Sequence, residues 1–389
     1  MPIETRACRP EERDALLTLV NRVFAAGGDM GAAFPLLFGP DNLDGLRIVS
    51  GDQGPVAHVG VCIRPAVILG ARLKVASIGA VCTDPAHRGG GLASALMADA
   101  RRYARENGAS LMLISGGRGL YRRLGYGDAG CFDRYQLQAS QLEGLEAPGV
   151  EVIDYREEDL PAIAALQQAE PVRFVRRASD WRRLLEAGLL MCDASDLLTI
   201  RQEGRLVAYI GVQRPSPGDS WTAGNVRIGE LAGSRSGIAA ALPALLDRYE
   251  VPVVNLWVQR TDVEMAVQAR SRGWTAQPQS FPGTVGVVDP PALIDALWPL
   301  LVERAAEAAE LKVTATEDGA IFALGREQVT VRAPGPLAAL LFGGDSEGGT
   351  RAAGHGAAAG PELPPAGALG PLLQALFPLP LLLPGYNYV

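Results

Sequence analysis

The sequence predicts an α+β protein built of two tandem α/β units and a smaller α+β segment at the C-terminal end. Two observations carry this prediction. The same succession of helix and strand patterns occurs twice before about Val285, and the pattern changes after it. With 389 residues, the chain is long enough for two or three domains. We expect boundaries that give domains 1–148, 149–285 and 286–389.

Composition and charge narrow the class of protein. The net charge is −7 and the sequence pI is about 5.2, without the basic excess of a nucleic-acid binder, so we expect no nucleic-acid partner. The five cysteines form no C-x-x-C pair and most lie in apolar strand-like segments, which predicts buried reduced thiols. The three histidines lack metal-ligand spacing, which predicts no metal site. A charged N-terminus and the lack of a long apolar run predict no signal peptide, no membrane span and a cytoplasmic location.

The most informative segment of the first unit is a strand followed by a glycine loop and a helix. An apolar run over 75–81 meets the turn Asp84-Pro85, and Gly89-Gly90-Gly91 opens directly into a helix pattern at Leu92. Glycines allow a close backbone approach and positive φ, and the N–H groups of a first helical turn have no partner within the helix. Together with the helix dipole, this arrangement predicts a site for a phosphate or diphosphate.

The residues of this loop match neither of two common phosphate-binding motifs. The dinucleotide fingerprint would need glycine at Ser94, and the nucleoside-triphosphate loop needs a Gly-Lys pair that the chain lacks. Arg88-x-x-Gly91-x-Ala93 does match the pattern [Arg/Gln]-x-x-Gly-x-[Gly/Ala]. About thirty residues later the chain reads Gly119-Leu-Tyr-Arg-Arg-Leu-Gly-Tyr-Gly127. Both segments resemble GNAT-type N-acetyltransferases, which bind acetyl-coenzyme A; a ligand-free strand-to-helix turn is the alternative for the loop alone.

The second unit repeats the plan of the first without its chemistry. The run Gly204-Arg-Leu-Val-Ala-Tyr-Ile-Gly-Val resembles Gly54-Pro-Val-Ala-His-Val-Gly-Val, and further matches follow in order. After Leu231 there is no Arg-x-x-Gly-x-Ala, and Ala269 falls where the first copy has Tyr121. We therefore expect a scaffold that binds no cofactor, with chance similarity of two α/β units as the alternative.

The third segment has a different pattern of elements. An amphipathic helix over 293–311 precedes short strands over 313–316, 320–324 and 328–332, and a short helix over 336–342. Residues 343–370 are rich in glycine, alanine and proline and predict a mobile loop.

The order of these three parts resembles the Eis-like (enhanced intracellular survival) family. That family has an active GNAT unit, a degenerate GNAT unit and an end domain similar to the sterol-carrier-protein fold. The resemblance implies mixed central sheets flanked by helices in both units. It also implies acetyl-coenzyme A as co-substrate, a small-molecule amine as acceptor and, by the family's habit, a homo-oligomer such as a hexamer.

The resemblance also implies roles for individual residues. Those expected to bind the co-substrate are Val81, Thr83, Arg88, Gly89, Gly90, Gly91, Leu92, Ala93 and Ser94. Val81 and Thr83 would hold the acyl and pantetheine part through backbone groups, and the others would hold the diphosphate. The Tyr121 hydroxyl would act as general acid, and the terminal carboxylate on Val389 would act as general base. The alternatives are a packing tyrosine, a frayed chain end, and a water chain as base.

Two questions stay open at this point. Arg118 stands where aminoglycoside-acetylating relatives tend to be acidic, and its charge would repel a polycation, so a smaller amine or a peptide amine is as good a candidate acceptor. The second question is whether the chain is an enzyme at all. A protein that senses an acyl-coenzyme A or a lipid without turnover is the competing function, and the intact Tyr121 and Arg88 favour the enzyme.

Overall fold

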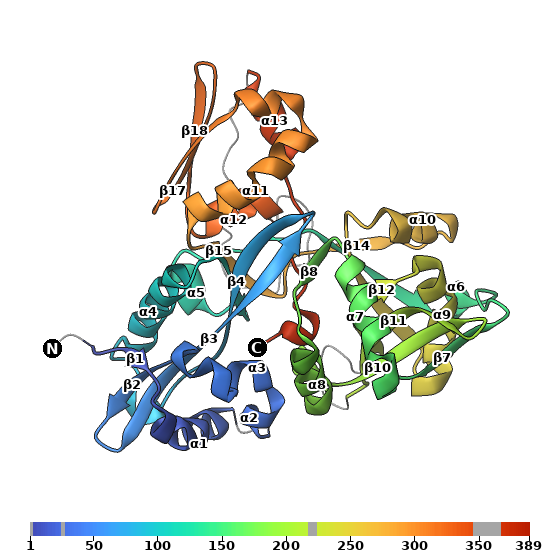
Figure 1. Cartoon of the computed structure of the whole chain (residues 1–389), viewed down its shortest axis with the longest axis horizontal. Coiled ribbons are helices and arrows are strands. Elements are labelled where there is room, and N and C mark those ends of the chain that lie inside the picture. The colour runs from blue at the N-terminus through green and yellow to red at the C-terminus, as the bar shows by residue number, and fades with distance from the viewer. Residues whose placement is uncertain (1–2, 25–27, 217–223, 345–366) are drawn as a thin grey trace. The chain divides into compact units, whose positions relative to one another are not determined.

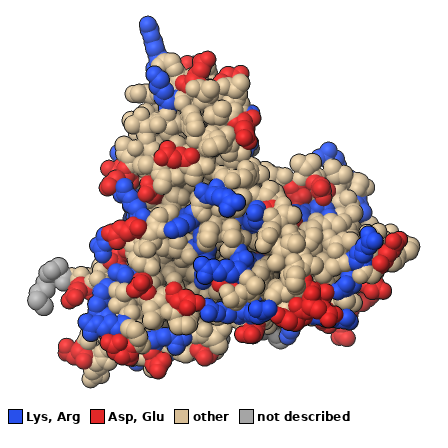
Figure 2. All heavy atoms as spheres, in the orientation of Figure 1, with Lys and Arg blue, Asp and Glu red and all other residues tan. Residues whose placement is uncertain are grey.

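The computed structural model describes residues 3–24, 28–216, 224–344 and 367–389 (Figure 1). The chain divides into two compact units. The first unit comprises Met1–Gly130, Ser280–Leu381 and Val389, and the second comprises Cys131–Gln279 and Leu382–Tyr388. On the face shown in Figure 2, acidic and basic side chains are interspersed.

The main sheet of the first unit is mixed, in the order β1-β2-β3-β4-β5-β15. Only β4 and β5 run parallel, and the other neighbours in this order are antiparallel. The strands are β1 (Arg6–Ala7), β2 (Leu46–Gly51), β3 (Gly54–Ile68), β4 (Ala71–Thr83), β5 (Ala109–Ser115) and β15 (Gly283–Val287).

Helices cover this sheet with apolar faces. α4 (Leu92–Glu106) packs on β2 to β5 through Leu96, Ala100 and Ala104, which lie four residues apart on one helix face. α1 (Arg13–Val23) packs on β3 and β4, and α11 (Pro290–Arg304) packs on β4 and β5. The remaining helices before residue 130 are α2 (Met30–Ala33), α3 (Pro35–Phe38) and α5 (Gly119–Arg123).

The rest of the first unit is a small antiparallel sheet with short helices. β16 (Lys312–Thr316), β17 (Gly319–Leu324) and β18 (Glu327–Arg332) pair in sequence order, close to the strands predicted there. α12 (Gly335–Phe342) and α13 (Leu369–Leu376) follow, and Phe377 after α13 packs edge-on against Phe322 of β17. Of the predicted mobile loop over 343–370, residues 345–366 lie outside the described residues, and α13 already begins at Leu369.

The second unit contains another mixed sheet, in the order β14-β6-β13-β12-β11-β10-β7, with β9 paired to β10. β12 and β13 are its parallel pair. α9 (Arg235–Tyr249) packs on β7 and on β10 to β13, and α7 (Leu160–Ala169) packs on β11 and β12. The strands of this sheet are β6 (Phe132–Gln138), β7 (Val150–Asp154), β9 (Leu189–Leu190), β10 (Asp193–Gln202), β11 (Arg205–Gln213), β12 (Val226–Gly233), β13 (Val253–Gln259) and β14 (Ala276–Gln279), and β8 (Val172–Phe174) is not part of it. The helices are α6 (Ala139–Leu142), α7 (Leu160–Ala169), α8 (Ala178–Ala187), α9 (Arg235–Tyr249) and α10 (Val263–Ser271).

The structure divides the chain differently from the boundaries that the sequence predicts. β6 precedes residue 148 but pairs with β13 and β14 of the second unit. β15 follows the second unit's residues but pairs with β5 of the first. Sequence patterns locate strands but do not identify the strands with which they pair. The pairing of β6 in the second unit and of β15 in the first was therefore not predictable from the sequence. The predicted fold class is confirmed in its main part, two mixed sheets flanked by helices.

Candidate active site

The main sheet of the first unit opens at the carboxyl end of β4. β4 pairs with β5 only as far as Ile78, opposite Ile114, whereas β4 itself runs on to Thr83. In the described pairing, the backbone over 79–83 therefore has no strand on its β5 side. Peptide N–H and C=O groups at such a place need other partners, and a ligand can supply them.

β4 also bulges beside this opening. Its register with β3 shifts between His58 and Gly60, so that Ala80 and Val81 together lie opposite a single residue of β3. Ala80 has a φ of 51°, in the left-handed region that residues other than glycine rarely adopt. Bulges of this kind turn the backbone and are common next to active sites. Here the bulge sets the direction of the Val81 peptide.

The loop after β4 has the geometry of an anion site. The Asp84 carboxylate accepts a hydrogen bond from the Ala86 N–H at 2.9 Å and so starts the turn. Gly89 and Gly91 have φ values of 84° and 77°, and Gly91 is the N-cap of α4 without a side-chain cap. The first-turn N–H groups of α4 are left uncapped at the positive end of the helix dipole.

These elements border a cavity of about 460 Å³. Most of the residues predicted to bind the co-substrate line it: Val81, Thr83, Arg88, Gly89, Gly91, Leu92, Ala93 and Ser94. Gly90 belongs to the same loop but is not among the lining residues. The cavity lies entirely within the first unit.

Further lining residues did not stand out in the sequence as ligands: Val23, Cys82, His87, Arg118, Leu120 and Arg123. Arg118 and Arg123 lie on either side of Tyr121 in the sequence, so these basic residues were a usable signal, whereas Val23 comes from α1 and carried none. Every charged or titratable group of the lining other than Cys82 is basic, and none is acidic. Such a lining attracts a polyanionic ligand.

Two of the arginines are held only weakly. Arg88 Nε donates to the Thr83 carbonyl at 3.4 Å, and Arg118 Nη1 donates to the Val81 carbonyl at 3.4 Å. Both distances are long for an N–H···O bond. Because both side chains are also exposed, their guanidinium groups can turn toward a phosphate at little cost.

Cys82 is the one thiol in the cavity wall. Its side chain is buried, and burial raises the pKa of the Cys82 thiol to about 12. The thiolate is the nucleophilic form of cysteine, so this thiol is inert near neutral pH. The wall therefore offers no cysteine nucleophile for a covalent acyl intermediate.

Tyr121 is buried in the hydrophobic core of the first unit. It sits on α5, is 2% exposed, and packs in the hydrophobic cluster that contains Val81 and Ile114. Burial raises its pKa, and the nearby Arg118 charge acts in the opposite direction. Tyr121 is not among the residues that line the cavity just described.

The chain ends against β4. Val389 is 6% exposed, and its carboxyl group lies beside Gly79, the first residue after the β4–β5 pairing stops. A Cβ atom on Gly79 would lie 2.3 Å from the carboxyl carbon of Val389. Only glycine leaves room for this end of the chain.

The second unit has the same construction at the matching place. β12 and β13 pair in parallel only as far as Ile228, and β12 shifts register with β11 between Gly211 and Val212. The turn after α10 repeats the turn after α5: the Trp274 N–H donates to the Ala269 carbonyl at 2.9 Å, as the Tyr126 N–H donates to the Tyr121 carbonyl at 3.1 Å. Ala269 thus holds the position of Tyr121, and the second unit has no hydroxyl there.

Its anion position is filled by the protein's own side chains. The Glu170 carboxylate accepts from the Gly233 N–H at 3.0 Å and from Arg235 at 2.6 and 2.9 Å. The Ser234 hydroxyl caps α9 by accepting from the Gly237 N–H at 3.1 Å. A diphosphate would have to displace these groups.

The opening beside β12 is filled as well. Tyr386 packs its ring against Gly211, and its N–H donates to Glu230 at 3.0 Å. Arg176 donates to both oxygens of Glu230 at 2.5 and 2.7 Å and lies over the Trp181 ring at 4.4 Å. This buried network holds residues 382–388 within the second unit.

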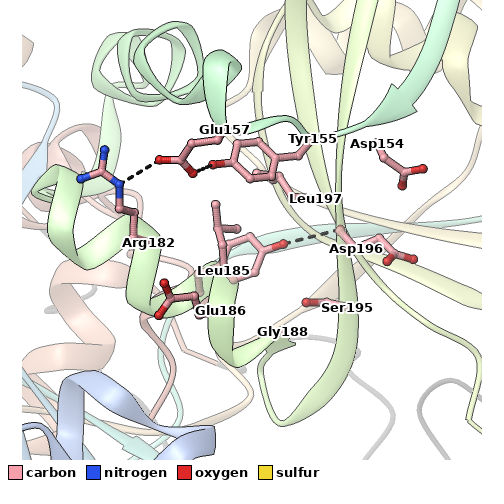
Figure 3. Close-up of a pocket in the computed structure, with 11 residues that line it drawn as sticks. Asp154, Tyr155, Glu157, Arg182, Leu185, Glu186, Gly188, Ser195, Asp196 and Leu197 are labelled. Atoms are coloured by element: carbon pink, nitrogen blue, oxygen red, sulfur yellow. Dashed lines mark hydrogen bonds and ion pairs between the residues drawn. The ribbon is translucent and has the colours of Figure 1, made fainter.

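A further cavity in the second unit, of about 490 Å³, is drawn in Figure 3. Three of its side chains bind one another: the Tyr155 hydroxyl donates to Glu157 at 2.6 Å, and Arg182 Nε donates to the same carboxylate at 2.8 Å. The Tyr386 hydroxyl donates to the Asp196 carbonyl at 3.5 Å. No glycine loop or uncapped helix of eight or more residues opens into it in the described residues.

Comparison with known proteins agrees with the first unit's geometry. Residues 4–129 match the family model "Acetyltransferase (GNAT) domain". The match ends just before β6, whose partners lie in the sheet of the second unit.

Solved structures resemble the chain over most of its length. A GCN5-related N-acetyltransferase from Anabaena variabilis has a TM-score of 0.61 at 14% identity, covering 87% of this chain and 89% of that one. One from Kribbella flavida has a TM-score of 0.58 at 17% identity, covering 87% and 88%. Eis1 from Mycobacterium abscessus has a TM-score of 0.54 at 15% identity, covering 84% and 85%. At these identities the likeness establishes the fold. No curated protein matches the sequence.

None of the described helices combines the length and the apolar run that a bilayer crossing requires. No group of three or more His, Cys, Asp or Glu side chains in the described ranges is arranged to hold a metal ion.

Proposed function

We propose that this protein is an N-acetyltransferase that moves the acetyl group of acetyl-coenzyme A to a primary amine by direct attack on the thioester. The observation that carries the proposal is the cavity of the first unit. It combines an open β4 edge, an uncapped N-terminus of α4 and an all-basic charged lining. Acetyl-coenzyme A has the matching parts: a strand-like pantetheine arm and a diphosphate.

The proposed binding mode follows from the placement of these groups. Arg88 and the N–H groups over 89–94 hold the diphosphate at the positive end of α4. Val81 and Thr83 hold the pantetheine arm by their peptide groups, in the place that β5 leaves vacant. The Val81 N–H, turned by the bulge, donates to the thioester carbonyl and stabilises the oxyanion that forms during attack.

The proposed chemistry needs no covalent enzyme intermediate. The nitrogen of a neutral amine attacks the thioester carbon, a C–N bond forms, the C–S bond breaks, and coenzyme A leaves as a thiolate. Tyr121 gives that thiolate a proton, and its raised pKa keeps the phenol protonated at neutral pH. The Val389 carboxylate takes the proton that the attacking nitrogen loses. The inert Cys82 thiol supports direct transfer rather than an acyl-cysteine.

The acceptor we propose is an amine with little other positive charge. Arg118 and Arg123 line the cavity and disfavour a polycation close to the thioester. A small amine or a peptide amine meets this condition better than an aminoglycoside. The Eis-like assignment, the sterol-carrier-like end domain, the cytoplasmic location and a homo-oligomer remain parts of the same proposal.

The test is thiol release from acetyl-coenzyme A with a panel of small amines, peptides and aminoglycosides. We expect release that depends on an amine and an acetylated amine in equal amount, with peptides or small amines ahead of aminoglycosides. Tyr121→Phe and a one-residue extension beyond Val389 should each slow turnover. Tight binding of acetyl-coenzyme A without amine-dependent release would instead identify the protein as an acyl-coenzyme A sensor and refute the proposal.

A further inference from the structure

The first unit contains a fully buried histidine that the proposed chemistry does not use. His58 lies on β3, is 0% exposed, and stacks on Phe38 of α3 with ring centroids 5.8 Å apart. Its Nδ1 lies 2.9 Å from the carbonyl oxygen of Ala80. Since a carbonyl oxygen only accepts, Nδ1 carries the proton and donates it.

The partner of this hydrogen bond is the strained residue of the bulge. Ala80 has the left-handed φ of 51°, and Val81 follows it directly into the cavity wall. A non-glycine residue stays in that conformation only where its surroundings hold it there. Within the described residues, the His58 side chain makes a hydrogen bond to the Ala80 carbonyl that is not part of the backbone pairing between strands.

The other ring nitrogen shows that packing alone does not explain this histidine. Nε2 is buried and has no hydrogen-bond partner in the described residues. A buried acceptor left unsatisfied is costly, and a phenylalanine or leucine would fill the same space without that cost. The hydrogen bond from Nδ1 is the gain that offsets it. Burial also lowers the pKa of His58 to about 4, so the ring stays neutral with one N–H to donate.

We infer that His58 is a positioning residue that locks the β4 bulge, so that the Val81 N–H points at the thioester carbonyl of the bound donor. The expected effect on kcat rests on the proposed function, whereas the hydrogen bond by which His58 holds the bulge does not depend on it. Substitutions that remove the Nδ1 donor should loosen the bulge and weaken the oxyanion contact. The diphosphate loop over 88–94 should be unaffected.

The matched variants are His58→Phe and His58→Asn. Phenylalanine keeps a ring against Phe38 but has no donor, whereas the asparagine amide carries its N–H at the same distance from the backbone as Nδ1. We expect the kcat of His58→Phe to fall about 10²-fold, the size of effect that follows the loss or misplacement of one oxyanion donor. The KM for acetyl-coenzyme A should stay within about threefold, because the diphosphate contacts remain. His58→Asn should recover kcat to within about threefold of the wild type.

A second readout needs no turnover. Amide hydrogen exchange of the peptide spanning residues 79–83 should be faster in His58→Phe than in the wild type, and close to the wild type in His58→Asn. If the wild type releases no thiol with any amine, the proposed function fails, and the exchange result still decides on the lock. Equal kcat and equal exchange in the Phe variant, or equal losses in the Phe and Asn variants, would overturn the inference.

If His58→Phe does not fold, the comparison moves to His58→Asn and His58→Gln. Glutamine carries its amide one bond further out, so its N–H cannot take the position of Nδ1. We then expect a lower kcat and faster exchange for Gln than for Asn. Indistinguishable Asn and Gln variants would also overturn the inference.

Discussion

Replacing Gly79 with alanine tests the role of the chain end. The added Cβ would lie 2.3 Å from the carboxyl carbon of Val389 and 2.5 Å from its oxygen, whereas ordinary contacts begin at 3.4 Å. The carboxylate must therefore retreat by about 1 Å, a displacement that costs a catalytic group about 10²-fold in rate. Gly79 has no positive φ, so alanine adds no backbone strain of its own. The same crowding should lower the free energy of unfolding by about 1–3 kcal/mol.

The assay is thiol release under saturating acetyl-coenzyme A, with donor affinity measured separately by calorimetry. We expect kcat to fall about 10²-fold, since loss of a general base costs about 10²–10⁴-fold. Donor affinity should change little, because the diphosphate loop is untouched. Val389→Ala is the matched control: it trims the side chain and leaves the terminal carboxylate in place, so its kcat should stay near that of the wild type.

One result would refute this reasoning. If Gly79→Ala folds and turns over at the rate of the wild type, the carboxylate of Val389 takes no part in the reaction. A large loss of donor affinity in the same variant would point to a displaced β4 rather than to a displaced base.

Four further predictions concern other parts of the chain. Arg88→Ala should weaken acetyl-coenzyme A binding by about tenfold in calorimetry, as expected for a lost charge-assisted contact, with little change in kcat. Tyr121→Phe should lower kcat about 10²-fold at nearly unchanged donor affinity, and a kcat equal to that of the wild type would remove Tyr121 as the acid. Arg235→Ala removes the ion-pair partner of two partly buried carboxylates in the second unit and should cost up to about 3–5 kcal/mol in denaturant unfolding, whereas Arg182→Ala, at an exposed pair, should cost far less. His58 should make the fold acid-sensitive: its pKa is lowered to about 4, so the unfolded chain takes up the proton first, and stability that is complete above about pH 6.5 is lost as the pH falls toward 4. The free energy of unfolding should fall by about 3 kcal/mol over this range. The His58→Asn variant should not show this fall when urea unfolding at pH 7 and at pH 4 is compared.

Local features of the site were predictable from the sequence because they depend on neighbouring residues. The glycine loop, its positive φ at Gly89 and Gly91, and the uncapped start of α4 follow from a few adjacent residues. The hairpin strands over 312–332 were equally accessible, since turn residues and alternating apolar residues mark them. The turn shared by Tyr121 and Ala269 confirms that the internal repeat was aligned correctly there.

Features that depend on distant partners were not predictable. Nothing near His58 indicates that its ring meets Ala80, and nothing in Gly79 indicates that the chain end lies against it. The second unit was expected to bind no cofactor because its motif is missing. That stays a prediction; in the structure, Glu170 and Tyr386 occupy the corresponding space. Pair interactions across long sequence distances leave no local pattern.

The pairing of β6 in the second unit and of β15 in the first has a consequence for folding during translation. β5 ends at Ser115, but its outer neighbour β15 begins only at Gly283, so the edge of β5 stays unpaired while residues 131–279 of the second unit are being translated. An unpaired strand edge is a template for wrong association. A nascent chain released early, or a gene truncated after residue 148, should therefore demand chaperones and precipitate, although every residue of the donor loop is already present.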